Sequence, residues 1–346
     1  MALALSPRRS HLLVCLGVNW ACRAARSTPQ SAQHTSTLVC PRPNRAYCGR
    51  VSVREGNQGV LAGFAAYGLW GLFPLYFSQL GPAGAWEILA HRVLWTFVFC
   101  LIGLTVVRGW AEAAAVLRKP RLAGALAVSG VLVTANWGIY VWAVVNGQVV
   151  DAALGYFINP LVTVALAVVV LHERLRPGQI AALAIGAVAV IVLIAGYGQV
   201  PWVAIGLALT FGVYSLAKNR IGPHATPLVG LTLETTALTP VSIVFIAWLQ
   251  ITGTGTFTSH GPLHTWLLVL AGVVTALPLL LFAAAARRIP LAMIGLLQYV
   301  TPICQFLIGV FIDHEIMPPA RWAGFGLIWC ALLALTWDTI RSMRHA

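Results

Sequence analysis

The chain has 346 residues, of which 59% are hydrophobic and only 9% are charged. About a quarter of the residues of a soluble domain are charged, so this chain cannot cover a water-exposed surface and lipid must cover most of it. The formal net charge is +13, but the bases lie in short clusters between apolar runs, which excludes nucleic acid as a partner. The composition predicts an all-α polytopic membrane protein.

Residues 1–58 differ from the rest. They hold 8 of the 22 Lys and Arg residues and 4 of the 7 Cys residues, with no apolar periodicity. We predict that they form a disordered extension, or lie upstream of a true start near Val51 or Val53. The four cysteines have no zinc-ligand spacing and face a reducing compartment, so we expect neither a metal nor disulfides there.

Ten apolar runs follow from Gly59. Each is long enough for a helix of about 20 residues, which crosses about 30 Å of hydrocarbon. Short connections at 144–150 and 196–200 predict antiparallel neighbours. We expect transmembrane helices at 60–80, 86–107, 122–143, 151–171, 178–196, 201–217, 228–249, 265–285, 291–312 and 320–338.

Basic residues mark one side of the membrane. Every second connection carries clustered Arg or Lys, whereas the alternate connections hold only Arg321. Because cytoplasmic loops carry an excess of Lys and Arg, both termini are expected in the cytoplasm. We therefore predict a multi-pass protein of the plasma (inner) membrane, with residues 339–346 as a cytoplasmic tail.

The chain also repeats itself. Five spans precede a join near residue 198 and five follow it, and an odd number of spans inserts the second half upside down. We predict two inverted five-helix repeats, at 59–198 and 199–338. Inverted repeats are the recurring architecture of secondary transporters, with the site near the midplane. One constant shift along the chain aligns Gly130 with Gly272, Pro160 with Pro302, His172-Glu173 with His314-Glu315, Pro177 with Pro319 and Ala181 with Ala323, and a shift shorter by one position aligns Gly81-Pro82 with Gly222-Pro223.

Several strings in the spans carry a family resemblance. They are Glu87-Ile-Leu-Ala-His91-Arg92-Val-Leu-Trp95, Asn136-Trp137, Trp142-Ala-Val-Val-Asn146, Leu154-Gly-Tyr-Phe-Ile-Asn-Pro-Leu161, Leu231-Thr-Leu-Glu234 and Leu297-Gln-Tyr-Val-Thr-Pro302. Over about residues 56–342 the chain resembles the RarD subfamily of EamA-like permeases, in the drug/metabolite transporter (DMT) superfamily. The resemblance implies ten helices in two EamA repeats and a permease that exports metabolites or drugs. It implies no particular substrate.

Two prolines are expected to break the fourth and ninth spans near their middles. Pro160 and Pro302 remove the helical partners of the carbonyls of Tyr156 and Gln298, and a free carbonyl in hydrocarbon is costly unless protein, water or ligand satisfies it. We therefore expect substrate binding at these breaks, although neighbouring helices healing a kink is the alternative. The polar side chains around the breaks are Tyr156, Asn159, Gln298, Tyr299 and Thr301.

Ionisable residues within spans are costly and usually face a cavity or a partner. Glu87, His91 and Arg92 lie in the outer half of the second span, and Glu234 lies in the seventh. The repeat offset places Glu234 beside Arg92, so we expect both to face one cavity between the halves. Arg92 would hold an anionic substrate group, and Glu87, His91 or Glu234 would exchange protons or gate transport. A fixed ion pair, or Glu87 capping its helix, is the alternative.

The third span offers Asn136, Trp137 and Tyr140 on one face, where the rings would stack on an aromatic or cationic substrate or pack between helices. Asp151 is expected to cap the fourth span. The two His-Glu pairs lack the spacing of a zinc site, and the chain has no GxxxxGK[ST] phosphate loop. We therefore expect no metal and no cofactor, with transport driven by a gradient or merely equilibrating.

These observations favour a secondary transporter that moves a small organic solute across the bilayer by rocking its halves, with protons as a candidate coupling ion and a homodimer left open. A membrane-embedded enzyme acting on lipid or prenyl groups is an alternative, but none of the nine acids forms a DxxD pair, so we expect no enzyme. The other alternative is a non-transporting sensor subunit.

Overall fold

The computed structural model describes residues 53–171, 175–197, 200–221, 224–286, 288–289, 294 and 297–344. These residues form helices and contain no strand. The predictions for residues 1–52 and for the pairs His172-Glu173 and Gly222-Pro223 lie outside the described residues. The first described helix begins at Val53, inside the predicted extension 1–58.

Seven described helices are long and apolar enough to cross a membrane. An apolar run in lipid must satisfy its backbone hydrogen bonds internally, and the helix does this within one segment. These helices coincide with the second to fifth, seventh, eighth and tenth predicted spans and confirm an all-helical, multi-pass protein. They are α3 (Ala85–Val106), α5 (Pro120–Val145), α6 (Val149–Leu171), α7 (Pro177–Tyr197), α9 (Pro227–Ile251), α10 (Gly261–Ala286) and α13 (Pro319–Arg344).

The other three predicted spans take different forms. The first is α1 (Val53–Gly71), followed after a bend of 44° by α2 (Phe73–Phe77) and the short helix η2 (Ser78–Leu80). The sixth and ninth are represented by the shorter apolar helices α8 (Trp202–Ile221) and α12 (Val300–Phe311). Counting the bent pair as one span, the described residues hold eight membrane-length helices, and ten spans remain a prediction.

Only one of the two prolines that were expected to break a span lies at an interruption of its helix. Helix α6 continues through Pro160, and the Thr163 hydroxyl donates a hydrogen bond to the Asn159 carbonyl at 2.9 Å. The prediction that Pro160 breaks the fourth span is therefore wrong, whereas the ninth predicted span is interrupted by a turn at Gln298 and Tyr299, close to Pro302. α12 begins at Val300 after a turn, so Pro302 occupies its first turn, where a missing N–H costs no helical hydrogen bond.

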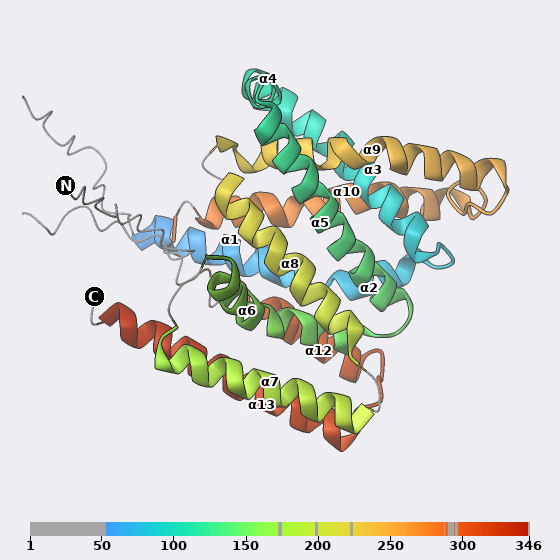
Figure 1. The fold of residues 1–346 in the computed structure, drawn as a ribbon. Coiled ribbons are helices and arrows are strands. Elements are labelled where there is room, and N and C mark those ends of the chain that lie inside the picture. The colour runs from blue at the N-terminus through green and yellow to red at the C-terminus, as the bar shows by residue number, and fades with distance from the viewer. Residues whose placement is uncertain are drawn as a thin grey trace, which may run out of the picture.

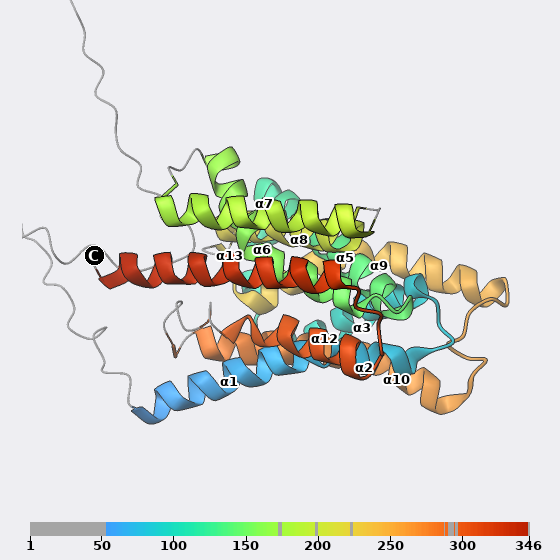
Figure 2. The same ribbon diagram turned by 90° about the horizontal axis from the view of Figure 1, so that it is seen from below.

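The helices form a bundle in which the start of α1 and the end of α13 lie at the same end (Figures 1 and 2). Helix α3 packs against α9 and α10, α5 against α8 and α9, α6 against α8 and α12, and α1 against α10 and α12. Helices α7 and α13 pack along each other at one edge of the bundle (Figure 1).

Glycines lie at matched helix crossings. A Cβ atom on Gly130 of α5 would overlap the backbone of Glu234 in α9, and one on Gly272 of α10 would overlap the backbone of Trp95 in α3. The two glycines are the pair that the sequence repeat aligns with each other. Because a side chain would separate these helices, both crossings require glycine.

The α7–α13 pair follows the same repeat. Gly178 of α7 lies against Asp338 of α13, and Gly196 of α7 lies against Ala320 of α13. The constant shift that aligns Gly130 with Gly272 turns each of these contacts into the other. Two more contacts that are equivalent under the repeat, to within one position, join Gly71 to Cys304 and Gly212 to Val162.

One helix was not predicted. Helix α4 (Trp110–Leu117) lies in the basic connection between α3 and α5 and is too short to span a membrane. Its Glu112 accepts hydrogen bonds from the Thr226 backbone N–H at 2.7 Å and from the Thr226 hydroxyl at 3.1 Å. Glu112 therefore caps the start of α9 from another connection.

Candidate substrate site around Arg92

Arg92, on α3, is 3% exposed and lies inside the bundle. Its Nε donates a hydrogen bond to the Thr275 hydroxyl of α10 at 3.0 Å. The guanidinium carbon lies 4.4 Å from the ring centroid of Trp137, 5.2 Å from that of Phe77 and 5.4 Å from that of Phe73. Ring faces attract a cation through their negative quadrupole. Helices α2 and α5 thus supply an aromatic cage for the cation on α3.

The charge of Arg92 is not balanced by a carboxylate among the described residues. The ion pairs of the described part of the chain all involve other bases, and Nη1 of Arg92 has no hydrogen-bond partner there. The phenol groups of Tyr76, Tyr140 and Tyr156 are near enough to interact electrostatically with the guanidinium. A buried charge without a counter-ion is costly, and in a membrane protein it indicates a functional site.

Asn136 lies between helices rather than in the cage. Its Nδ2 donates to the Leu207 carbonyl at 3.1 Å and to the Thr210 hydroxyl at 3.0 Å, both on α8. Its Oδ1 accepts from the Tyr156 hydroxyl of α6 at 3.4 Å. These bonds hold α5, α6 and α8 together, so the structure places Asn136 and Tyr156 beside the cage as an interhelical link.

Tyr140 joins the cage to α12. Its ring centroid lies 6.1 Å from that of Phe77 and 5.9 Å from that of Tyr156. Its hydroxyl oxygen accepts from Nε2 of Gln305 at 3.2 Å, and Gln305 also donates to the Trp70 carbonyl at 3.3 Å. Oε1 of Gln305 is buried and has no hydrogen-bond partner among the described residues.

Sequence reasoning missed Gln305. Its signal was a lone amide in the apolar run that follows Pro302, one helical turn after Thr301. The Thr301 hydroxyl donates to the Tyr67 carbonyl at 2.7 Å, so it links α12 to α1. Like Oε1 of Gln305, Oδ1 of Asn159 is buried and has no hydrogen-bond partner in the part of the chain that the structure describes.

The other predicted residues of the ninth span lie elsewhere. Tyr299 packs against the hydrophobic core formed by α6, α7 and α13. The backbone N–H of Gln298 donates a hydrogen bond to the Ile294 carbonyl at 3.0 Å. The described contacts do not bring either side chain to Arg92.

Glu87 and His91 bind the connection between α9 and α10. Oε1 of Glu87 accepts from the backbone N–H of Thr256 at 2.7 Å, so Glu87 caps a loop rather than its own helix. The His91 ring stacks on Phe257 with centroids 4.6 Å apart, and Nδ1 of His91 accepts from Nε1 of Trp95 at 3.2 Å. These contacts close the end of α3 that is predicted to be external.

Glu234 has its own partners. Its Oε1 accepts from the Ser129 hydroxyl of α5 at 2.6 Å and from Nζ of Lys218 in α8 at 2.9 Å. Glu234 therefore forms a fixed ion pair, which was the alternative to a role in proton exchange, and its counter-ion is Lys218. The sequence reading assigned Lys218 to a loop, although it ends an apolar run that continues from Tyr214.

A second charged cluster joins α6 to α13 at the end predicted to be external. Nη2 of Arg321 lies 2.6 Å from Oδ1 of Asp151, and its Nη1 lies 3.6 Å from Oε2 of Glu315. Asp151, predicted as a helix cap, is thus an ion-pair partner, while Oε1 of Glu315 accepts from the Val150 N–H at 3.0 Å. Burial raises the pKa of Glu315 to about 7, although the Val150 amide and Arg321 act to lower it.

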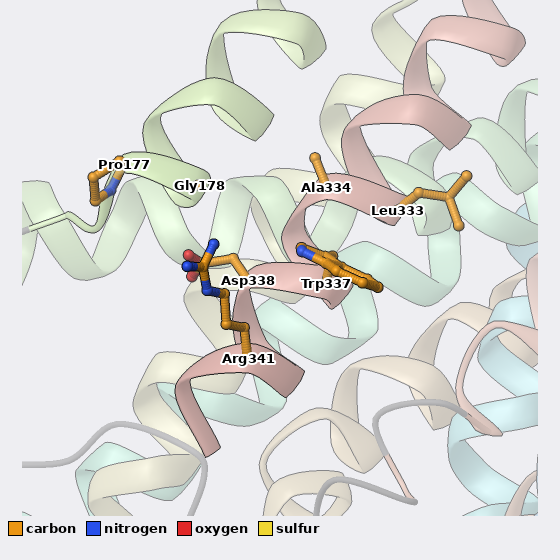
Figure 3. A pocket seen from close by; sticks show the side chains of 7 residues that line it. All are labelled: Pro177, Gly178, Leu333, Ala334, Trp337, Asp338 and Arg341. Atoms are coloured by element: carbon orange, nitrogen blue, oxygen red, sulfur yellow. The ribbon is translucent and has the colours of Figure 1, made fainter. Parts of the chain in front are cut away.

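A surface groove of about 850 Å³ lies between the start of α7 and the end of α13 (Figure 3). Arg92 is not among the residues that line it. The acidic group of the groove is already paired, since Oδ2 of Asp338 lies 3.2 Å from Nε of Arg176. Because the apolar side chains of Leu333 and Trp337 are exposed to the lipid side, we place the candidate site at Arg92. The groove is lined by Pro177, Gly178, Leu333, Ala334, Trp337, Asp338 and Arg341.

Comparisons with known proteins agree on one family. The model of the EamA-like transporter family matches residues 57–195. Protein RarD of Streptomyces exfoliatus is 46% identical over 84% of this chain and 92% of its own length. The uncharacterized transporter YojE of Bacillus subtilis is 41% identical over 84% of this chain and 97% of its own length. A solved crystal structure matches with a TM-score of 0.52 and 20% identity, over 81% of this chain and 97% of that one, a likeness of fold alone.

Proposed function

We propose that this chain, which belongs to the RarD family of EamA-like transporters, is a secondary transporter that exports a small organic metabolite or drug across the plasma membrane by alternating access. Family membership and the apolar helices make it a membrane permease of the DMT type. The observation that carries the proposal is the caged, unneutralised Arg92 inside the bundle.

The site draws on both predicted halves. Helices α2, α3, α5 and α6 belong to residues 59–198, and α10 and α12 belong to residues 199–338. The first half supplies Arg92 and its aromatic rings, while the second supplies Thr275 and Gln305. A site between two halves is where a rocking transporter exposes its solute to each side in turn.

Matched contacts support the inverted repeat. The exchange of contacts along α7 and α13 follows one constant shift along the chain, and the same shift aligns the crossing glycines Gly130 and Gly272, whose partner residues match to within one helical turn. Two halves that meet through equivalent surfaces have two equivalent ways of opening, one toward each side of the membrane. This supports alternating access as the mechanism.

The proposal includes the orientation of the chain in the membrane and the coupling of transport to protons. The described ends of the chain lie at one end of the bundle (Figure 1), which agrees with two cytoplasmic termini. Glu87 and His91 would then gate the external side through the α9–α10 connection. Glu234, whose partner Lys218 is partly exposed, is the proposed group for proton exchange.

Reconstitution tests the function. An untargeted comparison of metabolites in cells and medium, with and without the full-length protein, should reveal a solute that accumulates in cells lacking it. The purified protein in proteoliposomes should then catalyse counterflow of that solute. A solute that changes sides in cells but shows no counterflow would contradict transport and favour the sensor subunit.

A further inference from the structure

We infer that the Arg92 site takes a small organic anion, whose carboxylate or similar oxyanion pairs with the guanidinium and whose body packs against the aromatic cage. This inference rests on the proposed function and narrows its substrate class. It follows from the charge of Arg92, from its Nη1 atom, which has no partner among the described residues, and from the aromatic rings around it.

The charge is the first argument. Arg92 is 3% exposed, and no carboxylate among the described residues pairs with it. Glu234, the acid that the sequence repeat aligns with Arg92, already binds Ser129 and Lys218 and is not its counter-ion. Ring faces offset only part of the cost of burying a cation. An anionic solute supplies the missing charge, whereas a cation would be repelled by Arg92.

The geometry is the second argument. Thr275 occupies Nε, and the ring of Trp137 lies over the guanidinium carbon at 4.4 Å. Hydrogen-bond donors of a guanidinium point outward in its plane, and the aromatic rings of the cage supply no oxygen acceptor for them. Nη1 has no partner in the described part of the chain. A planar oxyanion meets the edge of a guanidinium with short, charge-assisted hydrogen bonds.

The walls are the third argument. Phe73, Phe77 and Trp137 already face the cation. They offer an apolar lining to the body of an anion. Tyr140 leads from this lining to Gln305, whose unpartnered Oε1 is a buried acceptor. A hydroxyl or N–H on the solute would satisfy that acceptor.

Binding is tested on the purified full-length protein in detergent with benzoate and with benzamide, its neutral analogue of similar shape. A ligand that binds the folded state raises the unfolding midpoint in proportion to its affinity. Benzoate should raise the midpoint at concentrations where benzamide does not. Equal shifts with the two compounds, or no shift with benzoate, would overturn the inference.

Variants locate the effect. Arg92→Gln should raise the benzoate concentration for a half-maximal shift at least about tenfold, the size of effect that a lost charge-assisted contact produces. Arg118→Gln, at an exposed position after α4, is the matched control and should bind benzoate like the parent. Thr275→Val keeps the charge but frees Nε, and should weaken binding severalfold. Unchanged benzoate binding in folded Thr275→Val and Arg92→Gln proteins would overturn the inference.

The transported solute separates this inference from the proposed function. The solute found by the metabolite comparison should be an anion at neutral pH, and Arg92→Gln should abolish its counterflow while Arg118→Gln leaves it intact. Counterflow of a neutral or cationic solute would uphold the transporter and overturn the inference. Benzoate binding without counterflow of any solute would uphold the anion site and contradict the proposed function.

Discussion

Arg92 and Glu234 occupy equivalent positions in the sequence repeat, on the neighbouring helices α3 and α9. Each bonds to a hydroxyl on the third membrane helix of the other predicted half, Thr275 or Ser129. Glu234 also has a counter-ion in Lys218, whereas Arg92 contacts aromatic rings and has no counter-ion among the described residues. The difference teaches that equivalent positions need not be balanced alike, since Glu234 is neutralised by a base of the chain and the described residues give Arg92 no counter-ion.

The two positions also differ in their access to water. The side chain of Glu234 is 0% exposed and that of Lys218 is 29% exposed, so the pair reaches toward solvent through the lysine. A long basic side chain near a helix end commonly extends its charge to the interface. Arg92 lies in the outer half of α3 but is covered by α2, α5 and α10. Water reaches it only if those helices move.

The largest expected effect comes from removing the counter-ion of Glu234. Lys218→Met leaves a buried carboxylate unpaired and should lower the free energy of unfolding by ~3 kcal/mol, the low end for a broken buried pair because the lysine is partly exposed. Unfolding in detergent, followed by tryptophan fluorescence, measures the loss. The double variant Lys218→Met/Glu234→Gln should recover most of it. A single variant as stable as the parent would contradict the pairing.

A smaller effect is expected at the cage. Trp137→Leu keeps an apolar side chain but removes the ring nearest the guanidinium, and a desolvated cation–π contact contributes about 2 kcal/mol. The unfolding midpoint should fall, and benzoate should bind less tightly. Trp266→Leu, at a position 63% exposed on the outside of the bundle, is the control. Equal midpoints for the two variants would show that the cage does not stabilise Arg92.

Glu315 can be compared with Glu234, because it shares its basic partner, Arg321, with a second acid, Asp151. Its pKa is raised from 4.5 to about 7 by burial, so the folded protein holds this proton more tightly than the unfolded chain does. Its contribution to stability is therefore present in full below pH 4.5 and is lost as the pH rises to about 7. Glu315→Gln should remove this dependence. Midpoints measured from pH 4.5 to 8 should decline less steeply in the variant, and parallel curves would refute the assignment.

The smallest effect is expected for an ion pair open to water. The side chains of Arg176 and Asp338 are 41% and 18% exposed, and an exposed pair contributes only ~0–1 kcal/mol. Arg176→Gln should therefore change the unfolding midpoint little, and less at high salt. A loss as large as that of Lys218→Met would show that burial does not set the difference between the two pairs.

The sequence was most informative about features that depend on neighbouring residues. Apolar runs predicted the seven long helices within a few residues of their bounds. Local rules missed the short helix α4 and wrongly placed a break at Pro160, through which α6 continues. The presence of a buried charge at Arg92 and at Glu234 was also readable from the chain, because both lie within apolar runs.

The partners of those charges were decided by the tertiary structure. Hydropathy sums neighbouring residues, whereas Arg92 meets Thr275 183 residues away and Glu234 meets Ser129 105 residues away. Which face of each helix turns inward, and at what height two helices cross, depends on packing around glycines such as Gly130. The sequence by itself therefore determined a helical membrane permease with charges inside it. Only the packing of the helices decided that Glu234 is neutralised by Lys218 and that Arg92 is not.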